Sequence, residues 1–183
     1  MNDTNKSVMM VLLMVMSSLL AGYSPAIGDV EAAQVVITDA VQVVDGGQVN
    51  DRMAAVDSDA DGNIHIVWSR NTQHLFYTML DARAQTVISA TQISNTGAHR
   101  SWNPDIEVDD SGMVHIVWTN TAGQHSIVYT LLDPSFHAQD GSPGDDSSLS
   151  MVDDFIVSQR NQDRGWPAIA LDSLGSVHIV WQD

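Results

Sequence analysis

The residues whose spacing first suggests chemistry are three alternating aspartates before a glycine, namely Asp57, Asp59 and Asp61. Alternating carboxylates ahead of a turn supply oxygen ligands of the kind that calcium takes, about six to eight at a time. A complete calcium loop needs further carboxylates, but His65 stands at the ninth position of the run and Trp68 at the twelfth. Two interpretations stay open, a calcium site and an ordinary hairpin turn. We favour the turn, because equivalent turns later in the chain lack the triple carboxylate.

A histidine and a tryptophan recur in three similar segments of the chain. Equivalent residues of separate repeats lie too far apart to ligate one metal ion, so we expect each histidine ring to bond a neighbouring backbone group. We expect the tryptophans to pack between sheets rather than to bind sugar. The six residues are His65, His115 and His178, with Trp68, Trp118 and Trp181.

Two further tryptophans stand outside this pattern, Trp102 and Trp166, shortly before Pro104 and Pro167. They fall near the edge of a predicted strand, and they are the candidates for an aromatic side chain that faces a ligand. The sequence contains no nucleophile elbow, phosphate-binding loop or zinc-binding helix motif. It therefore names no catalytic residue.

The element that must position these residues is the repeated pattern D-x-x-G-x-[IV]-H-I-V-W, whose glycines are Gly62, Gly112 and Gly175. Their spacing falls in the range of propeller blades. Each unit holds four short segments rich in β-branched and aromatic residues, separated by Gly, Asp, Asn or Ser turns. The H-I-V-W segment is apolar on both faces, as expected of a sheet that lies between neighbouring sheets.

The pattern predicts an all-β fold, a partial β-propeller of four-stranded antiparallel blades, with about two full blades plus flanking strands. A propeller typically closes with at least about four blades, so we expect a fragment of a longer protein, with assembly of several copies or open stacking as alternatives. The expected divisions are a signal peptide and the start of the mature chain (1–33) and an incomplete propeller (34–183), which comprises a D-type strand and linker (34–51), blade 1 (52–101), blade 2 (102–163) with a long loop (134–150), and the first two strands of blade 3 (164–183).

The first segment has the features of an export signal. Lys6 precedes an apolar run over residues 8–23, which is followed by small residues. The run is shorter than a comfortable bilayer span of about 20 residues, so we expect cleavage, no membrane insertion afterwards, and a secreted or cell-surface protein.

The net charge is −16, and the chain has no cysteine. Such a surface repels phosphate backbones and anionic lipid, which argues against nucleic-acid binding. Most of the acidic residues are Asp beside Gly, Ser or Asn, which indicates turns.

At these repeats the chain resembles the sialidase-like (BNR, Asp-box-type) propeller repeats of bacterial and archaeal surface proteins. The resemblance is carried by residues 167–181 and their two counterparts. It departs from the Asp-box, in which an aromatic residue follows the glycine by three positions, where this chain has histidine. The resemblance implies that sialidase chemistry would need three arginines, a Tyr–Glu pair and an acidic Asp. Past the signal, Glu107 is the only glutamate, and no pattern selects an arginine triad.

We therefore expect an exported, non-catalytic module that binds glycan or protein at the cell surface. A partial sialidase-type glycoside hydrolase and a structural repeat of an envelope protein are the alternatives. No cofactor is expected apart from the calcium considered above, and an oligomer is expected if the chain is complete.

Overall fold

The computed structural model describes residues 40–44, 49–94, 100–121, 125–135, 149–158 and 165–182, and the backbone of short strands at 10–11, 14–15 and 36–37. No helix in these segments is long and apolar enough to span a bilayer. The predicted signal peptide and most of the predicted loop at 134–150 lie outside the described residues.

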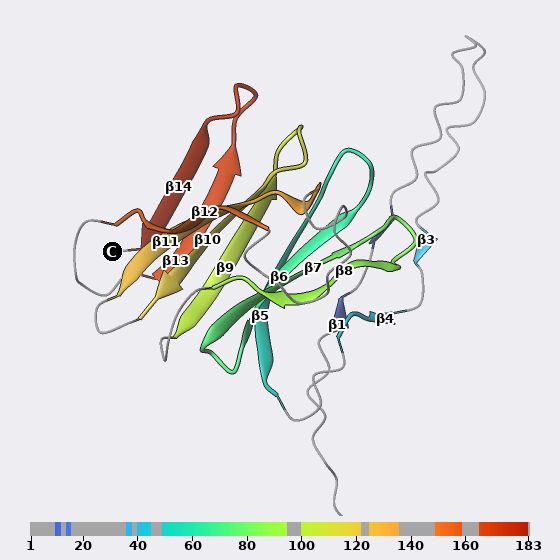
Figure 1. Ribbon diagram of the computed structural model, residues 1–183, viewed down its shortest axis with the longest axis horizontal. Coiled ribbons are helices and arrows are strands. Elements are labelled where there is room, and N and C mark those ends of the chain that lie inside the picture. Colours follow the sequence, from blue (N-terminus) through green and yellow to red (C-terminus); the bar gives the residue numbers. More distant parts are fainter. Residues whose placement is uncertain are drawn as a thin grey trace, which may run out of the picture.

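Ten strands form two four-stranded antiparallel sheets and one two-stranded hairpin, and in each of them the strands follow chain order. We call these units the first sheet, the second sheet and the third hairpin (Figure 1). Their strands are β5 (Asp51–Ser58), β6 (Ile64–Arg70), β7 (His74–Leu80) and β8 (Thr86–Gln92); β9 (Ser101–Val108), β10 (Val114–Asn120), β11 (Ser126–Leu132) and β12 (Ser150–Ile156); and β13 (Gly165–Leu171) and β14 (Val177–Gln182).

Four shorter strands precede them. β1 (Met10–Val11) pairs with β4 (Val41–Gln42), and β2 (Met14–Val15) pairs with β3 (Val36–Ile37). The D-type strand expected within residues 34–51 is thus represented by β3 and β4, which pair with N-terminal strands and not with a four-stranded sheet.

The turn between the first two strands of each unit explains the aspartate of the repeat. Asp59 Oδ1 accepts the backbone N–H groups of Asp61 and Asn63 at 3.0 and 2.8 Å. Asp109 and Asp172 make the same pair of bonds in the later units. A left-handed glycine then completes the turn, as at Gly62, where φ is 82°. Much of the acidity of the chain therefore serves to terminate strands.

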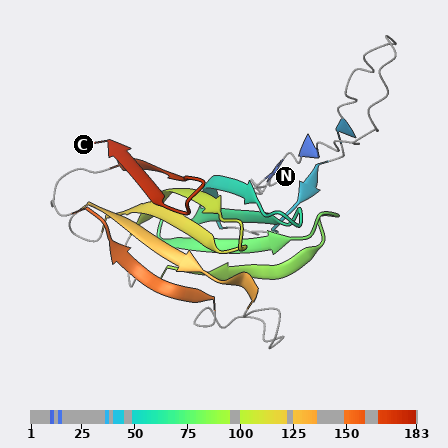
Figure 2. The ribbon, with the colours of Figure 1, turned by 90° about the horizontal axis from the view of Figure 1, so that it is seen from above.

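The sheets stack face to face (Figure 2). Alternation along β6 directs Ile66 and Trp68 to one face and Val67 to the other, and Val67 belongs to the apolar cluster between the first and second sheets. A second cluster joins the opposite face of the second sheet to the third hairpin. The first of these clusters includes Val67, Tyr77, Met79 and Ile88 of the first sheet and Ile116, Trp118 and Val128 of the second; the other includes Val117, Ile127, Ile169 and Ile179.

The first strands of the three units, β5, β9 and β13, lie side by side, and we call them the inner strands. Two carboxylates join them: Asp57 Oδ2 accepts the backbone N–H of Val108 at 2.7 Å, and Asp105 Oδ2 accepts that of Ile169 at 2.9 Å. Successive four-stranded sheets that stack through both faces around adjacent inner strands are propeller blades. The predicted all-β, partial-propeller fold is confirmed.

Candidate ligand-binding face

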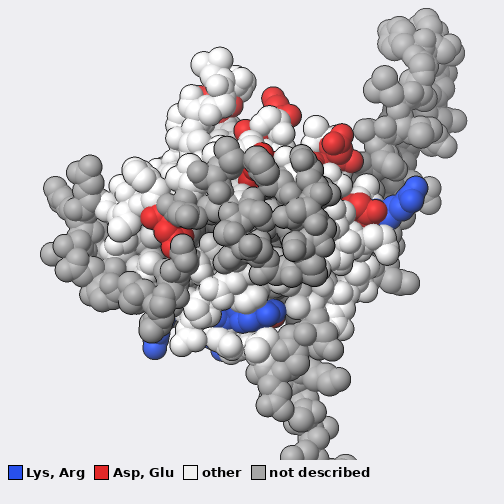
Figure 3. All heavy atoms as spheres, viewed as in Figure 1, with Lys and Arg blue, Asp and Glu red and all other residues white. Residues whose placement is uncertain are grey.

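Charge divides the molecule into two ends. Of the four arginines that the structure describes, Arg52, Arg70 and Arg100 lie at the end where strands two and three, and successive units, are connected; we call it the loop end. Arg83 lies at the opposite end, and Arg70 is paired with Asp51, with 2.8 Å between Nε and Oδ1. The opposite end, the turn end, carries the carboxylates of the hairpin turns. In Figure 3 most of the red carboxylates lie in the upper half of the view and most of the blue groups lie below, apart from one blue group at the upper right. In a chain of net charge −16, the loop end is the favourable one for an anionic or polar ligand. The turn carboxylates are Asp59, Asp61, Asp81, Asp109, Asp110, Asp133 and Asp172.

Each inner strand has a β-bulge near the loop end. At this point two residues of the inner strand stand opposite one residue of the neighbouring strand in all three units. A non-glycine residue adopts a left-handed conformation at each bulge, namely Met53 (φ 54°), Asn103 (φ 46°) and Trp166 (φ 48°). Such a conformation costs about 1–3 kcal/mol per residue and concentrates at binding sites, as bulges also do.

The three bulges place aromatic and polar side chains at corresponding positions of neighbouring inner strands. We define the bulge row as these three residues together with the residue before each, Arg52, Trp102 and Gly165. The Trp166 side chain is 70% exposed, and Trp102 is half-buried with the Arg100 guanidinium carbon 5.8 Å from its ring. Aromatic faces combined with Arg and Asn hydrogen-bond donors suit a ligand that has both apolar faces and polar edges.

Buried polar atoms without a partner also gather at the loop end. Among the described residues, six buried side-chain atoms have no hydrogen-bond partner, and four of them lie in the first or last two residues of strands at this end. Such groups are rare in folded proteins, and these four lie beneath the surface of the loop end, where a ligand on the surface would not contact them directly. The four are His74 Nδ1, Ser101 Oγ, Trp102 Nε1 and Thr119 Oγ1.

The structure places the two tryptophans predicted to face a ligand in adjacent strands of this row. Trp166 occupies the left-handed position of its bulge, whereas Trp102 precedes the left-handed residue of its own. The sequence did not reveal Arg52 or Met53 as members of the row, because Met53 is followed by Ala54 where the other two units have proline.

At the turn end, the repeated histidine lies between an aspartate and a tyrosine. His65 Nε2 lies 3.3 Å from Asp59 Oδ2, and His65 Nδ1 lies 2.8 Å from the Tyr77 hydroxyl. His115 makes the same two contacts with Asp109 and Tyr129. We call each trio a relay. The expected bond from the histidine ring to a backbone group was wrong: its partners are side chains.

Each relay has the order of groups found in a nucleophilic triad, namely hydroxyl, imidazole and carboxylate. The surroundings of the hydroxyl group differ from those of a nucleophile. Burial of the Tyr77 hydroxyl raises its pKa, and the Asp59 carboxylate raises it further. Burial lowers the pKa of His65, against the opposing effect of Asp59. Burial also opposes ionisation of Asp59, but hydrogen bonds from Asn63 and His65 outweigh it, so the pKa of Asp59 is lowered. A buried, neutral hydroxyl is a poor nucleophile, and the relay is a structural element.

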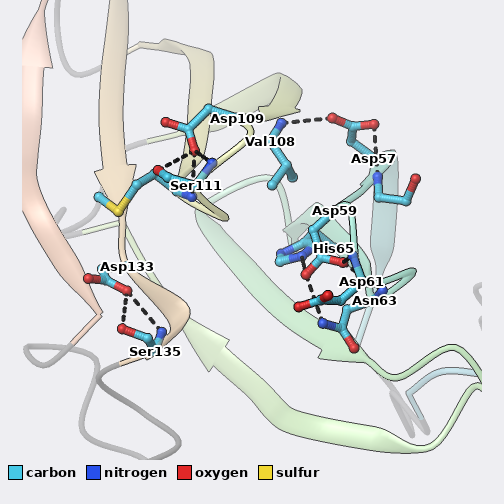
Figure 4. A network of polar contacts seen from close by, with 12 residues as sticks. Asp57, Asp59, Asp61, Asn63, His65, Val108, Asp109, Ser111, Asp133 and Ser135 are labelled. Atoms are coloured by element: carbon cyan, nitrogen blue, oxygen red, sulfur yellow. Dashed lines mark hydrogen bonds and ion pairs between the residues drawn. The ribbon is translucent and has the colours of Figure 1, made fainter. Parts of the chain in front are cut away.

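The three aspartates of the calcium interpretation do not converge. Asp57 points toward the second sheet, where it accepts the N–H of Val108, and Asp59 faces Asn63 and His65 within its own turn (Figure 4). The described residues contain no group of three His, Asp or Glu side chains arranged to hold a metal ion. The geometry is that of a hairpin turn with an attached contact between sheets.

Glu107 lies half-buried on the inner strand β9. Burial raises the pKa of its carboxyl, and the nearby carboxylates of Asp57 and Asp105 raise it further. Each of these two neighbours has an oxygen bonded to a backbone N–H across a sheet boundary. The three carboxylates therefore belong to the packing of the inner strands, and we assign none of them a catalytic role.

Comparison with known proteins adds little to this description. No protein-family model matches the chain, and a search of curated proteins gives no match. Among solved structures, the chain is similar to an endo-arabinase from Bacteroides thetaiotaomicron, with a TM-score of 0.48 and 13% sequence identity. The similarity covers 80% of this chain and 56% of that protein, so the chain spans little more than half of its neighbour's length. The assignment of the fold rests on the sheet packing described above.

Proposed function

We propose that this chain is a non-catalytic propeller module, of the sialidase-like repeat type, that binds a glycan at its loop end and acts outside the cell. The bulge row is the observation that carries the proposal. It aligns an exposed tryptophan, a half-buried tryptophan and an arginine on neighbouring inner strands.

The ligand class follows from the chemistry of the row. A sugar ring offers a C–H face to Trp166 and hydroxyl groups to Arg52 and Asn103, so one ligand could use both kinds of side chain. Arg52 is already oriented, because Asn50 Oδ1 accepts its Nε–H at 2.7 Å. An oriented donor loses less conformational entropy when it binds.

The test is a glycan array followed by titration calorimetry with the glycan that binds. Trp166→Ala should weaken binding at least tenfold, since stacked aromatic rings dominate such interfaces. Leu174→Ala, which also truncates an exposed apolar side chain but at the turn end, should leave the affinity unchanged. Equal affinity of the Trp166→Ala and wild-type chains would refute this site.

The sialidase-type alternative makes a different prediction, namely turnover of a fluorogenic sialoside. We expect none, because both histidines of the hydroxyl–imidazole–carboxylate groups are buried at the turn end and their tyrosines are buried (Tyr77) or half-buried (Tyr129). Measurable turnover that is lost in Glu107→Gln would replace the binding role by a hydrolytic one.

A further inference from the structure

Two arginines at the loop end of the first sheet differ in how their charge is used. Arg70 is neutralised, because its Nε and Nη2 lie 2.8 and 3.1 Å from the two carboxylate oxygens of Asp51. This pair belongs to the fold, since the Asp51 side chain is 2% exposed and the Arg70 guanidinium carbon lies 4.2 Å from the ring centre of Phe76. Arg52 is exposed, and no carboxylate of the described residues pairs with it. Its charge is therefore available to a ligand.

A neutral side chain holds Arg52 in place. Asn50 Oδ1 accepts the Nε–H of Arg52 at 2.7 Å. Asn50 is itself tied to the turn between β6 and β7, where its N–H donates to Asn71 Oδ1 at 3.0 Å and its carbonyl accepts the Asn71 N–H at 2.8 Å. In a chain with 23 acidic residues, an amide at this position orients the guanidinium group without neutralising it.

The oriented guanidinium group presents its two Nη atoms. Arginine has five N–H donors in a planar fork, and Asn50 uses the one on Nε. The two Nη groups can donate in parallel to two oxygens of one sulfate or carboxylate group, and such charge-assisted bonds are roughly twice as strong as bonds between neutral groups. Arg52 therefore favours an oxyanion over a sugar hydroxyl.

The second unit adds a positive charge at the position equivalent to Asn50, which is occupied by Arg100. The Arg100 carbonyl accepts the N–H of Thr121 at 3.0 Å, as the carbonyl of Asn50 accepts that of Asn71. The Arg100 guanidinium carbon lies 5.8 Å from the ring centre of Trp102, a member of the bulge row. Two neighbouring units thus each bring one unpaired guanidinium group to the row.

The carboxylates of the turn end are too distant to cancel this charge. A strand of seven residues such as β6, at about 3.3 Å per residue, separates the two ends by about 23 Å. The screening length at physiological salt is about 8 Å, so the turn carboxylates contribute little to the potential at the row. Asp51, which precedes Arg52 in the sequence, is already bonded to Arg70.

We propose that Asn50 and Arg52 make the bulge row selective for glycans that carry an anionic substituent, a sulfate ester or a carboxylate, over neutral glycans. Arg52 contacts the anion, and Asn50 is a positioning residue that keeps the guanidinium group oriented and charged. One oriented arginine is sufficient for this preference, so it needs no arginine triad. The selectivity rests on the glycan-binding role proposed above.

The experiment compares dextran sulfate with dextran and polygalacturonate with its methyl ester. In each pair the backbone is the same and the charge differs, and calorimetry on the full chain measures the affinity. We expect the charged member of at least one pair to bind at least about tenfold more tightly, the equivalent of one charge-assisted hydrogen bond. The pair that shows the preference identifies the anion as sulfate or carboxylate. The preference should shrink as salt is added, because Arg52 is exposed.

Three chain variants locate the selectivity. Asn50→Asp keeps the hydrogen-bond acceptor but pairs a carboxylate with Arg52, and it should remove most of the preference without lowering the melting temperature. Gln73→Glu is the matched control, because it adds the same charge at an exposed position of the same end and should leave most of the preference intact. Asn50→Ala keeps the charge of Arg52 but frees its side chain, and it should give an intermediate preference.

Failure of the selectivity and failure of glycan binding have different outcomes. If the chain binds glycans but prefers the charged member of neither pair, the selectivity is wrong and the glycan-binding role stands. If no polymer and no glycan on the array binds, the glycan-binding role is wrong and the selectivity with it. Equal effects of Asn50→Asp and Gln73→Glu would also overturn the role of Asn50, because the preference would then reflect the overall charge of the loop end.

Discussion

The first sheet and the third hairpin contain the same ten-residue motif in different surroundings. Trp68 is 0% exposed, and its counterpart Trp181 is 37% exposed. His65 is buried between Asp59 and a tyrosine, whereas His178 is exposed and, of the side chains that the structure describes, bonds only that of Asp172. The backbone of the turn, with its aspartate hydrogen bonds and left-handed glycine, is the same in both. The motif thus determines the turn and the strand, and the neighbouring strands determine what becomes buried.

Along the inner strands, in contrast to the tryptophans, the residue of the first unit is more exposed than its equivalent in the third. Val56 is 54% exposed, and its equivalents Ile106 and Ile169 are 4% and 6% exposed. These residues point toward the preceding unit, and no unit precedes the first sheet among the described residues. Burial of this inner-strand position therefore depends on a neighbouring unit. Ile66 and Trp68, on the same face of the first sheet, are instead buried against Val43, Val44 and side chains of their own sheet.

The largest effect expected is that of removing a tryptophan that lies between two complete sheets. Trp118→Ala should lower the free energy of unfolding by about 3–5 kcal/mol, the usual cost of deleting a large buried ring. Trp181→Ala should cost about 1–2 kcal/mol, because part of its ring is already in water. Urea unfolding followed by circular dichroism measures both. Equal losses would show that the third hairpin is as well packed as the second sheet.

A smaller effect is expected of removing a hydroxyl from the relays. Tyr77→Phe leaves His65 Nδ1 buried without a partner and should lower the free energy of unfolding by about 1–2 kcal/mol. Tyr129→Phe should cost less, since Tyr129 is half-buried and water can take the place of its hydroxyl at His115 Nδ1. The same unfolding assay applies, and a greater loss for Tyr129→Phe would contradict the ranking by burial.

The smallest effect is the pH dependence that the first relay confers. Because burial lowers the pKa of His65 below 6.5, the unfolded chain binds this proton more readily than the folded chain. The stability from His65 is therefore complete above pH 6.5 and declines as the pH falls through the folded value, at no more than about 1.4 kcal/mol per pH unit. The melting temperature is measured between pH 7.5 and pH 5 at intervals of about half a unit. It should depend less on pH in His65→Gln than in the wild-type chain. An unchanged slope would assign the decline to other groups.

The strands could be predicted from the sequence because turn residues and β-rich segments recur at matched positions. The residues of the relays could also be predicted, because an aspartate, a histidine and a tyrosine recur together in the first two units. Their contact with one another could not, because it depends on the pairing of β6 with β7.

The bulge row was only partly predictable. Met53, Asn103 and Trp166 share a backbone conformation but no chemistry, so no common residue type marks the position. The carboxylate contacts between inner strands gave no repeat signal either, because Asp57 and Asp105 occupy different positions of their strands.

The unequal distribution of charge between the two ends affects how the molecule is oriented before it touches a charged partner. Among the described residues, carboxylates predominate at the turn end, where Arg83 is the one guanidinium group, and Arg52 and Arg100 carry unpaired positive charge at the loop end; these charges form an electric dipole roughly parallel to the strands. Near a negatively charged polymer, the resulting torque turns the arginine-bearing end forward before collision, over a range of about 8–10 Å at ordinary salt. Orientation during approach would then precede recognition, and it would weaken as ionic strength rises.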